Sequence, residues 1–268
     1  CVYHAAGNGQ NIYKDCLHSA RKTRMINAYH QNASGSEGGT AMDYYYSYIL
    51  YMLPAMLLAI WAQISVKSTF SKYQKIGNSR GMSGSDAARA ILDANGLYHV
   101  RVERVPGSLT DHYDPRTETI RLSDGVYAST SVSAVGVAAH EAGHAVQHAT
   151  GYGPLTLRNA IIPVCNIGSR IAPYLIMAGL IFSIVQLYLA GIAAFSLVAL
   201  FQLITLPVEF NASHRALAAL SQTGGMSSDD LRGAKKVLTA AAMTYVAALF
   251  TSFMQILYYL SRLNRRKD

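Results

Sequence analysis

Residues 44–66 read YYYSYILYMLPAMLLAIWAQISV, a run of 23 residues without a charged side chain. As an α-helix this run would extend roughly 34 Å, which is enough to cross the hydrocarbon core of a bilayer. Tyrosines at its start and Trp61 near its end match the aromatic belts of the two membrane interfaces. The run therefore predicts a transmembrane helix, in which Pro54 introduces a kink that neighbouring helices can accommodate.

Two further runs lack charged residues. Residues 171–208 form a run of 38, which fits two minimal spans joined by a tight turn near Ala190 and Gly191 better than one straight helix. Residues 237–261 are long enough for one more span. We expect about four hydrophobic helices, and the alternative for each is a buried core helix.

Composition supports a membrane protein. Of the residues, 51% are hydrophobic and only 14% are charged, against about 25% charged in an ordinary soluble domain. These values exclude a disordered chain and a coiled coil. The three cysteines form no CxxC pair, so neither a disulfide framework nor a cysteine zinc site is expected.

The formal net charge of +8 fits either nucleic-acid binding or the basic loops of a membrane protein. Basic residues flank the apolar runs, at 67–80 and 262–267, and do not interleave with aromatic residues, so we expect no nucleic-acid partner. The positive-inside rule then places the N-terminus outside and the chain after Val66 in the cytoplasm. If all four hydrophobic segments cross the membrane, the basic tail would lie outside, against this rule. Residues 237–261 could therefore lie within the protein or at the membrane interface instead.

Residues 1–41 have a different composition, rich in Asn, Gly, Ser and His. They end in the linker-like SGSEGGT, and Met42 would make a natural start. We expect a disordered N-terminal extension without an assigned function.

Residues 68–170 have the composition of a small globular domain. Ser83 and Asp86 resemble a capping box, an apolar stripe follows, and Gly96 is placed as a helix stop. Alternating residues predict short strands at 98–105 and 117–122, with the extended segment LTDHYDP between them. A helix of small residues is predicted at 131–150.

That helix contains His140, Glu141 and His144 in the pattern HExxH. Histidines at i and i+4 project from one helix face, so both can bind one Zn²⁺ while the glutamate acts as general base on the metal-bound water. His148 continues the stripe, but Gln147 and Thr150 occupy the positions at which metzincins require Gly and His. His148 is therefore expected to be solvated or to support a ligand.

The third ligand is expected at Glu209, the next acidic residue along the chain. A carboxylate at the membrane boundary is costly unless it is paired or binds a metal, and pairing with Arg215 is the alternative. Pro207 can open a new helical turn just before it. For Glu209 to reach His140, the intervening chain must cross the membrane an even number of times.

Four segments together resemble a known family: LTDHYDP, AAHEAGHAVQHATGYGPLTLR, TLPVEFNASHRAL and AAMTYVAAL. From residue 42 to about 260 the chain resembles the YugP-like neutral zinc metallopeptidases of bacterial membranes, and it is distantly similar to HtpX-like membrane peptidases. Ser213 stands where the latter have an aspartate, so that carboxylate's role does not carry over. The resemblance implies one Zn²⁺ per chain, held by His140, His144 and Glu209, with Glu141 as the base.

The expected fold is a mainly α membrane protein with a small α+β zincin-like domain of the gluzincin type. Its expected segments are an extension (1–41), a transmembrane helix (42–66), a cytosolic zincin-like domain (67–158), a hydrophobic hairpin (159–206), a ligand helix and cytosolic loop (207–236), a fourth hydrophobic helix (237–261) and a basic tail (262–268). The expected location is the bacterial inner membrane, with the site on the cytoplasmic side.

The expected reaction is hydrolysis of peptide bonds in a protein or peptide substrate, which could itself be a membrane protein. His112, His214 and Tyr245 are candidates for stabilising the oxyanion. LTDHYDP could pair with a substrate strand, or Asp111, His112 and Asp114 could form a second metal site. The alternative function is a catalytically silent membrane scaffold or chaperone with a structural zinc, for which Glu141 would be dispensable.

Overall fold

The structure is a computed structural model that describes residues 41–222 and 226–264. The expected extension of residues 1–41 and most of the basic tail lie outside these ranges. The chain divides into two units, residues 1–47 and 48–268, and the arrangement described below is that of the second unit.

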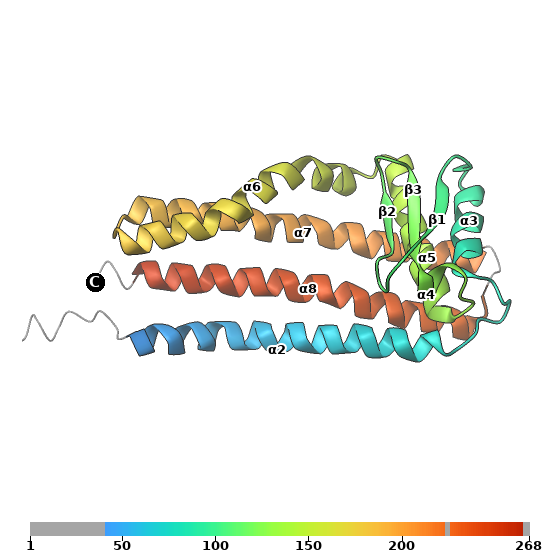
Figure 1. The fold of residues 1–268 in the computed structure, drawn as a ribbon, viewed down its shortest axis with the longest axis horizontal. Helices are drawn as coiled ribbons and strands as arrows, with labels where there is room; N and C mark the ends of the chain where they lie inside the picture. The colour runs from blue at the N-terminus through green and yellow to red at the C-terminus, as the bar shows by residue number, and fades with distance from the viewer. Residues whose placement is uncertain (1–40, 223–225, 265–268) are drawn as a thin grey trace, which may run out of the picture. The chain divides into compact units, whose positions relative to one another are not determined.

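Four long helices account for most of this unit. They are α2 (Ala41–Gln74), α6 (Gly153–Ile181), α7 (Val185–Gln222) and α8 (Ser228–Asn264). Each contains a stretch long and apolar enough to cross a membrane, which confirms the expectation of about four hydrophobic helices. In Figure 1 the helices run alongside one another, with the small sheet at one end.

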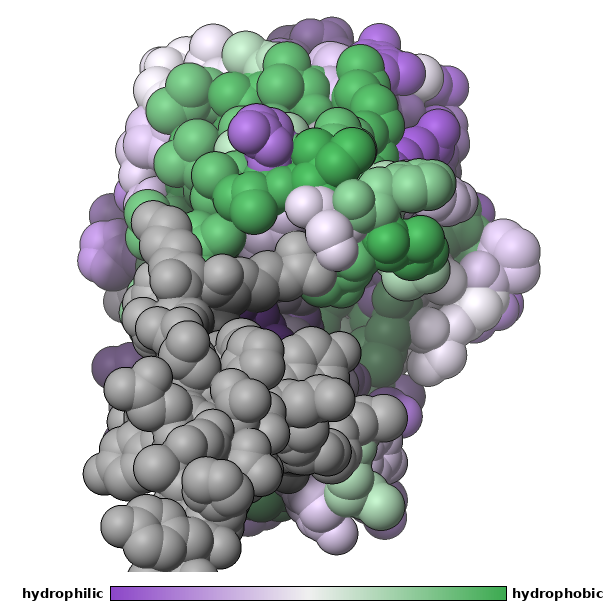
Figure 2. Space-filling model, turned by 90° about the vertical axis from the view of Figure 1, so that its left-hand side faces the viewer, coloured by the Kyte–Doolittle hydropathy of each residue, from purple (hydrophilic) through white to green (hydrophobic). Residues whose placement is uncertain are grey.

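The turn between α6 and α7 lies at residues 182–184, not near Ala190 and Gly191 as predicted. Gly191 instead lies inside α7, where a Cβ would come within 2.8 Å of the backbone nitrogen of Ile176 in α6. The small residue thus serves close helix packing. Figure 2 shows this end of the molecule, where much of the visible surface is hydrophobic. The turn contains one polar residue, Ser183 with a positive φ of 55°, between the exposed apolar residues Phe182 and Ile184.

The long helices extend beyond the charge-free runs from which they were predicted. α2 continues past Val66 to Gln74, and α8 begins at Ser228, ahead of the run that starts at Val237. Pro207 does not open a new helix, because α7 continues through it to Gln222. The charged residues in the last turn of α2 and the first turn of α8 therefore lie outside the apolar stretches.

The sheet has three strands, β1 (Arg101–Val105), β2 (His112–Asp114) and β3 (Thr119–Ser123), in the order β1-β3-β2. β1 pairs with β3 in parallel, and β2 pairs with β3 in antiparallel orientation. Strands were predicted at 98–105 and 117–122, and both are present in shorter form. The extended LTDHYDP segment supplies β2, which is an edge strand.

Three helices accompany the sheet: α3 (Gly84–Ala94), α4 (Asp124–Tyr127) and α5 (Val132–Ala149). The predicted capping box of Ser83 and Asp86 is present, and Gly96 follows α3 with a positive φ of 71°. The inward side chains Ile120 and Leu122 of β3 join a single core with the alanines of α5. This core holds α5 between the sheet and the long helices.

Candidate metal centre

Helix α5 carries the HExxH residues into the middle of the molecule. Its N-terminus is capped by Ser131, whose side chain accepts a hydrogen bond from the Ala134 amide. Gly143, inside the motif, allows α5 to approach α7 closely, because a Cβ there would lie 2.6 Å from the carbonyl oxygen of Ala212. The sequence of α5 therefore sets how near the two histidines come to the side chains of α7.

Glu209 of α7 meets both histidines. Its Oε2 lies 3.3 Å from His140 Nε2 and 3.7 Å from His144 Nε2. One potential ligand atom from each of the three residues lies within 4.8 Å of the others, and among the described residues this is the one such group of three. The Glu209 carboxylate is only 4% exposed. A buried carboxylate facing two imidazole nitrogens is a donor set suited to Zn²⁺.

The Nε2 atom of each imidazole faces Glu209, and the Nδ1 atom contacts a neutral side chain. His144 Nδ1 lies 3.0 Å from Gln147 Oε1, and His140 Nδ1 lies 3.1 Å from Ser213 Oγ. Because an amide oxygen can only accept, His144 must donate from Nδ1. A neutral ring then directs the lone pair of Nε2 toward Glu209, which is the tautomer that a metal ligand requires.

Gln147 is itself fixed by α7. It is fully buried, and its Nε2 donates to the carbonyl oxygen of Val208 at 2.8 Å and to Asn211 Oδ1 at 3.0 Å. These hydrogen bonds leave the side chain one orientation, with Oε1 toward His144. Gln147 therefore links the ligand on α5 to the helix that carries Glu209.

The acidic side chains around His144 favour its protonated, positively charged form. Burial lowers the pKa of His144, but hydrogen bonding to Glu209 and attraction to Glu141 outweigh it and raise the pKa above its ordinary value. The same carboxylates would favour a bound cation.

Arg158 of α6, not Arg215, makes the ion pair with Glu209. Arg158 Nη1 lies 3.3 Å from Glu209 Oε1, whereas Arg215 Nε donates to Asn211 Oδ1 at 2.8 Å. The alternative pairing of Glu209 with Arg215 is therefore wrong, because Arg215 is turned to its own helix. Arg158 contacts Oε1 of Glu209, whereas the two histidines lie next to Oε2.

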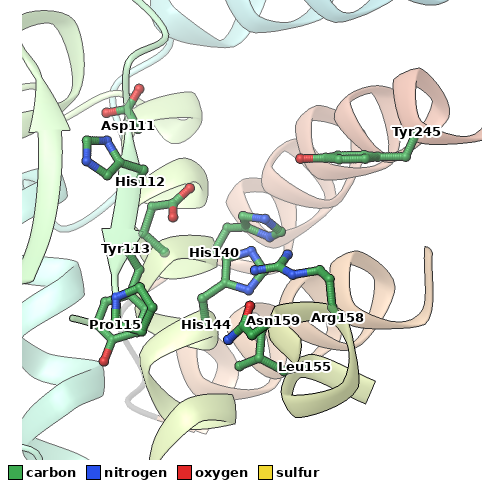
Figure 3. Close-up of a pocket in the computed structure, with 11 residues that line it drawn as sticks. Asp111, His112, Tyr113, Pro115, His140, His144, Leu155, Arg158, Asn159 and Tyr245 are labelled. Atoms are coloured by element: carbon green, nitrogen blue, oxygen red, sulfur yellow. The ribbon is translucent and has the colours of Figure 1, made fainter. Parts of the chain in front are cut away.

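A pocket of about 210 Å³ opens beside the cluster. Figure 3 shows it bounded by the histidines of α5, by Arg158 and Asn159 of α6, by Tyr245 of α8 and by residues around β2. A second pocket, of about 170 Å³, shares Asp111, His140, Glu141 and Tyr245 with it and is otherwise mostly apolar. Glu141 lines both pockets, so its carboxylate can reach a molecule bound at their junction.

The candidates for oxyanion stabilisation separate in the structure. His112 and Tyr245 line the first pocket, and in Figure 3 they lie on opposite sides of the histidines. His214 is exposed and lines neither of the two pockets. The structure therefore brings two of the three candidates to the cluster.

The possible second metal site is occupied by protein partners. Asp111 accepts hydrogen bonds from the backbone and hydroxyl of Ser123, and Asp114 forms an ion pair with Arg121 at 3.0 Å. Hydrogen bonding to Arg121 holds the pKa of Asp114 well below its usual range. His112 Nδ1 lies 2.8 Å from the carbonyl oxygen of Thr110. These groups stabilise the turn around β2 and do not converge on one point.

His148 contacts the sheet. Its Nδ1 lies 2.9 Å from the hydroxyl of Tyr113. Burial, with a smaller contribution from Glu118 and Asp114, raises the pKa of Tyr113 to about 12, so the phenol stays protonated and can donate to His148. This contact joins β2 to the end of α5.

Sequence reasoning did not find Gln147, Arg158 or Asn159 as site residues, and it assigned Ser213 no contact. Gln147 lies three residues after His144 and Ser213 four after Glu209, so helical spacing alone could have placed both on the inner faces. Arg158 and Asn159 come from another helix, and no local pattern connects them to the motif.

Known proteins are similar to nearly all of this unit. The family described as "Putative neutral zinc metallopeptidase" matches residues 48–264. A protein of Bacillus subtilis (strain 168) named "Putative membrane protease YugP" is 49% identical over 212 residues, which cover 79% of this chain and 94% of that protein. No solved structure matches the chain.

Proposed function

This chain belongs to the "Putative neutral zinc metallopeptidase" family, and from that membership we propose that it is a zinc-dependent, membrane-embedded endopeptidase of the gluzincin type. The observation that carries the proposal is the convergence of His140, His144 and Glu209 beside a pocket that Glu141 also lines. We propose one Zn²⁺ per chain, bound by these three side chains.

The donor set favours a catalytic over a structural zinc. Structural zinc sites are closed by four protein ligands, whereas catalytic sites have three and leave one position for water or substrate. Here His140 and His144 line the first pocket, and His140 and Glu209 line the second, so the three side chains lie where the two pockets meet. Bound zinc would act as a Lewis acid on the substrate carbonyl and lower the pKa of its water to about 7.

Glu141 is the proposed general base. It follows His140 directly, is 8% exposed and borders both pockets. A carboxylate in that position can accept a proton from the attacking water and pass it to the leaving amine nitrogen. Arg158 would hold Glu209 in place through its other carboxylate oxygen, Oε1, at 3.3 Å.

Oxyanion stabilisation is assigned to the groups around the first pocket. Tyr245 is the preferred donor, because its hydroxyl projects into the pocket in Figure 3 and the ring borders both pockets. His112 is the second candidate, from the opposite wall. Removing one such donor typically lowers kcat by about 10²–10³-fold.

The proposed substrate is a protein or peptide that crosses the two pockets. The second pocket is walled by α2 and α8, with Phe70, Val237 and Leu238 among its apolar residues. An apolar side chain next to the scissile bond would fit there, while the exposed edge of β2 could pair with the substrate backbone. A membrane protein would present such residues close to the bilayer.

The enzyme is proposed to be a multi-pass protein of the bacterial inner membrane with its site facing the cytoplasm. The support is the cluster of basic residues at 67–80, at the end of α2 that leads into the sheet.

The test is hydrolysis of a fluorescently labelled unstructured protein by the full chain in proteoliposomes. Glu141→Gln is expected to keep the wild-type zinc content and to lose about 10²–10⁴-fold in kcat, the contribution of a general base. The control Glu118→Gln makes the same chemical change at an exposed glutamate that borders neither pocket, and it should keep full activity. Wild-type hydrolysis by Glu141→Gln, or zinc-loaded wild type without hydrolysis, would instead favour a scaffold or chaperone with a structural zinc.

A further inference from the structure

A second cavity, separate from the metal centre, lies between α2 and α8 and has a volume of about 600 Å³. We define it as the α2–α8 groove. On α2 it is lined by Trp61, Ser65, Thr69, Lys72 and Tyr73, and on α8 by Arg232, Lys235, Lys236, Thr239, Ala240 and Met243. None of these residues borders the two pockets at the metal centre.

The spacing of these residues makes the groove long. Trp61, Ser65, Thr69 and Lys72 recur every three or four residues and so form one stripe along α2. Trp61 and Lys72 are eleven positions apart, as are Arg232 and Met243, which corresponds to roughly 16 Å along each helix. The groove is therefore long enough for part of an extended acyl chain and is longer than a small solute needs.

Charge and apolar surface lie at opposite ends of the groove. The end of α2 and the start of α8 meet near the sheet, so Lys72 lies at the same end as Arg232, Lys235 and Lys236. Trp61, Ala240 and Met243 lie at the end closer to the middle of the long helices. Tyr73 packs on α8 at Gly233, where a Cβ would come within 2.7 Å of the ring, and this contact holds the two helices together beside the cations.

Most of this positive charge is not neutralised by the protein. Arg232 pairs with Asp229, and Lys72 lies 5.7 Å from the centroid of the Tyr73 ring. Within the described part of the chain, no acidic side chain forms a salt bridge with Lys72, Lys235 or Lys236. Three adjacent cations at the boundary of apolar helices repel one another unless an anion joins them.

We propose that the α2–α8 groove binds one anionic phospholipid, with its phosphate between Lys72, Lys235 and Lys236 and an acyl chain along the stripe toward Trp61. Basic side chains beside a membrane attract anionic headgroups, and Trp61, 52% exposed, offers a flat apolar surface roughly 16 Å along α2 from Lys72. This proposal does not depend on the peptidase reaction.

The test is native mass spectrometry of the full chain, released from nanodiscs of phosphatidylglycerol or phosphatidylcholine. Wild type is expected to retain one phosphatidylglycerol and no phosphatidylcholine. The triple variant Lys72→Gln, Lys235→Gln, Lys236→Gln should bind phosphatidylglycerol at least about tenfold more weakly, since each juxtamembrane cation contributes about fivefold. The matched control Lys67→Gln, Lys75→Gln, Arg80→Gln removes the same charge outside the groove and should bind as wild type.

A variant without any charge change tests the apolar part. Thr239 is exposed and lines the groove, so Thr239→Trp should narrow it and release the lipid while the protein stays folded. Equal loss in the matched control, or equal retention of the two lipids, would overturn the proposal. Displacement of the lipid by millimolar inorganic phosphate would also contradict it, because the site would then bind the anion and not the lipid.

Discussion

Gln147 offers the sharpest test of how the metal centre is held. The structure makes it the side chain that orients His144, through the 3.0 Å contact between Gln147 Oε1 and His144 Nδ1. In Gln147→Leu the volume is nearly kept, but the Nδ1 proton loses its acceptor in a buried site. We expect the imidazole to change its tautomer or rotate, and either change weakens its Nε2 as a ligand.

The magnitude follows from the contacts. Partners that orient metal-binding histidines typically contribute 10–100-fold to metal affinity, which is about 1.4–2.8 kcal/mol. The carbonyl of Val208 and Asn211 also lose a donor in the variant, but Asn211 keeps its hydrogen bond from Arg215. The free energy of unfolding of the metal-free protein should therefore fall by about 1–3 kcal/mol, the cost of an unsatisfied buried polar group.

The assay is zinc competition with a chromogenic chelator in detergent, at fixed pH. Gln202→Leu is the matched control, because Gln202 lies on α7 and its buried Oε1 has no hydrogen-bond partner in the part of the chain that the structure describes. It should bind zinc as wild type does and should be at least as stable. If Gln147→Leu binds zinc within about twofold of wild type, the reasoning about His144 is refuted.

Three further predictions follow from the same contacts. Gly143→Ala should lower the thermal unfolding midpoint, with an overpacking cost of about 1–3 kcal/mol, because its Cβ meets the Ala212 carbonyl; an unchanged midpoint would contradict the close approach. Ser213→Ala should weaken zinc binding through His140 while Ser213→Thr restores it, as chelator competition can measure. Asp114→Asn should destabilise the fold more at pH 7 than at pH 2, because the lowered pKa of Asp114 gives stability that is fully present above about pH 4 and is lost progressively as pH falls toward its folded-state value; thermal unfolding at the two pH values tests this.

Much of the fold follows from local sequence patterns. Charge-free length predicted the membrane helices, and the capping box of Ser83 predicted the start of α3, since both depend on residues close together in the chain. The α6–α7 turn was misplaced because Ser183 is its one polar residue, between Phe182 and Ile184, and Gly191 has its role in packing between helices. A turn with a single serine and neither glycine nor proline carries only a weak local signal.

The residues of the candidate site also fall into two groups, those that a local sequence pattern predicts and those that it does not. His140, Glu141 and His144 follow from helical spacing, and Glu209 follows from the scarcity of acidic residues after the motif. Gln147 and Ser213 are neutral side chains whose importance arises from what they contact across α5 and α7. Arg158 reaches Glu209 from a third helix, 51 residues away in sequence, and only the folded structure shows that it replaces Arg215 as partner.

We propose above that His140, His144 and Glu209 together hold one zinc ion. Elemental mass spectrometry of the detergent-purified chain measures this directly, on wild type, His140→Ala, Glu209→Ala and the exposed control His214→Ala. We expect about one zinc per chain in wild type and in His214→Ala, and loss of zinc in the other two variants. Zinc retained by Glu209→Ala, or absent from folded wild type purified with its metal protected, would contradict it.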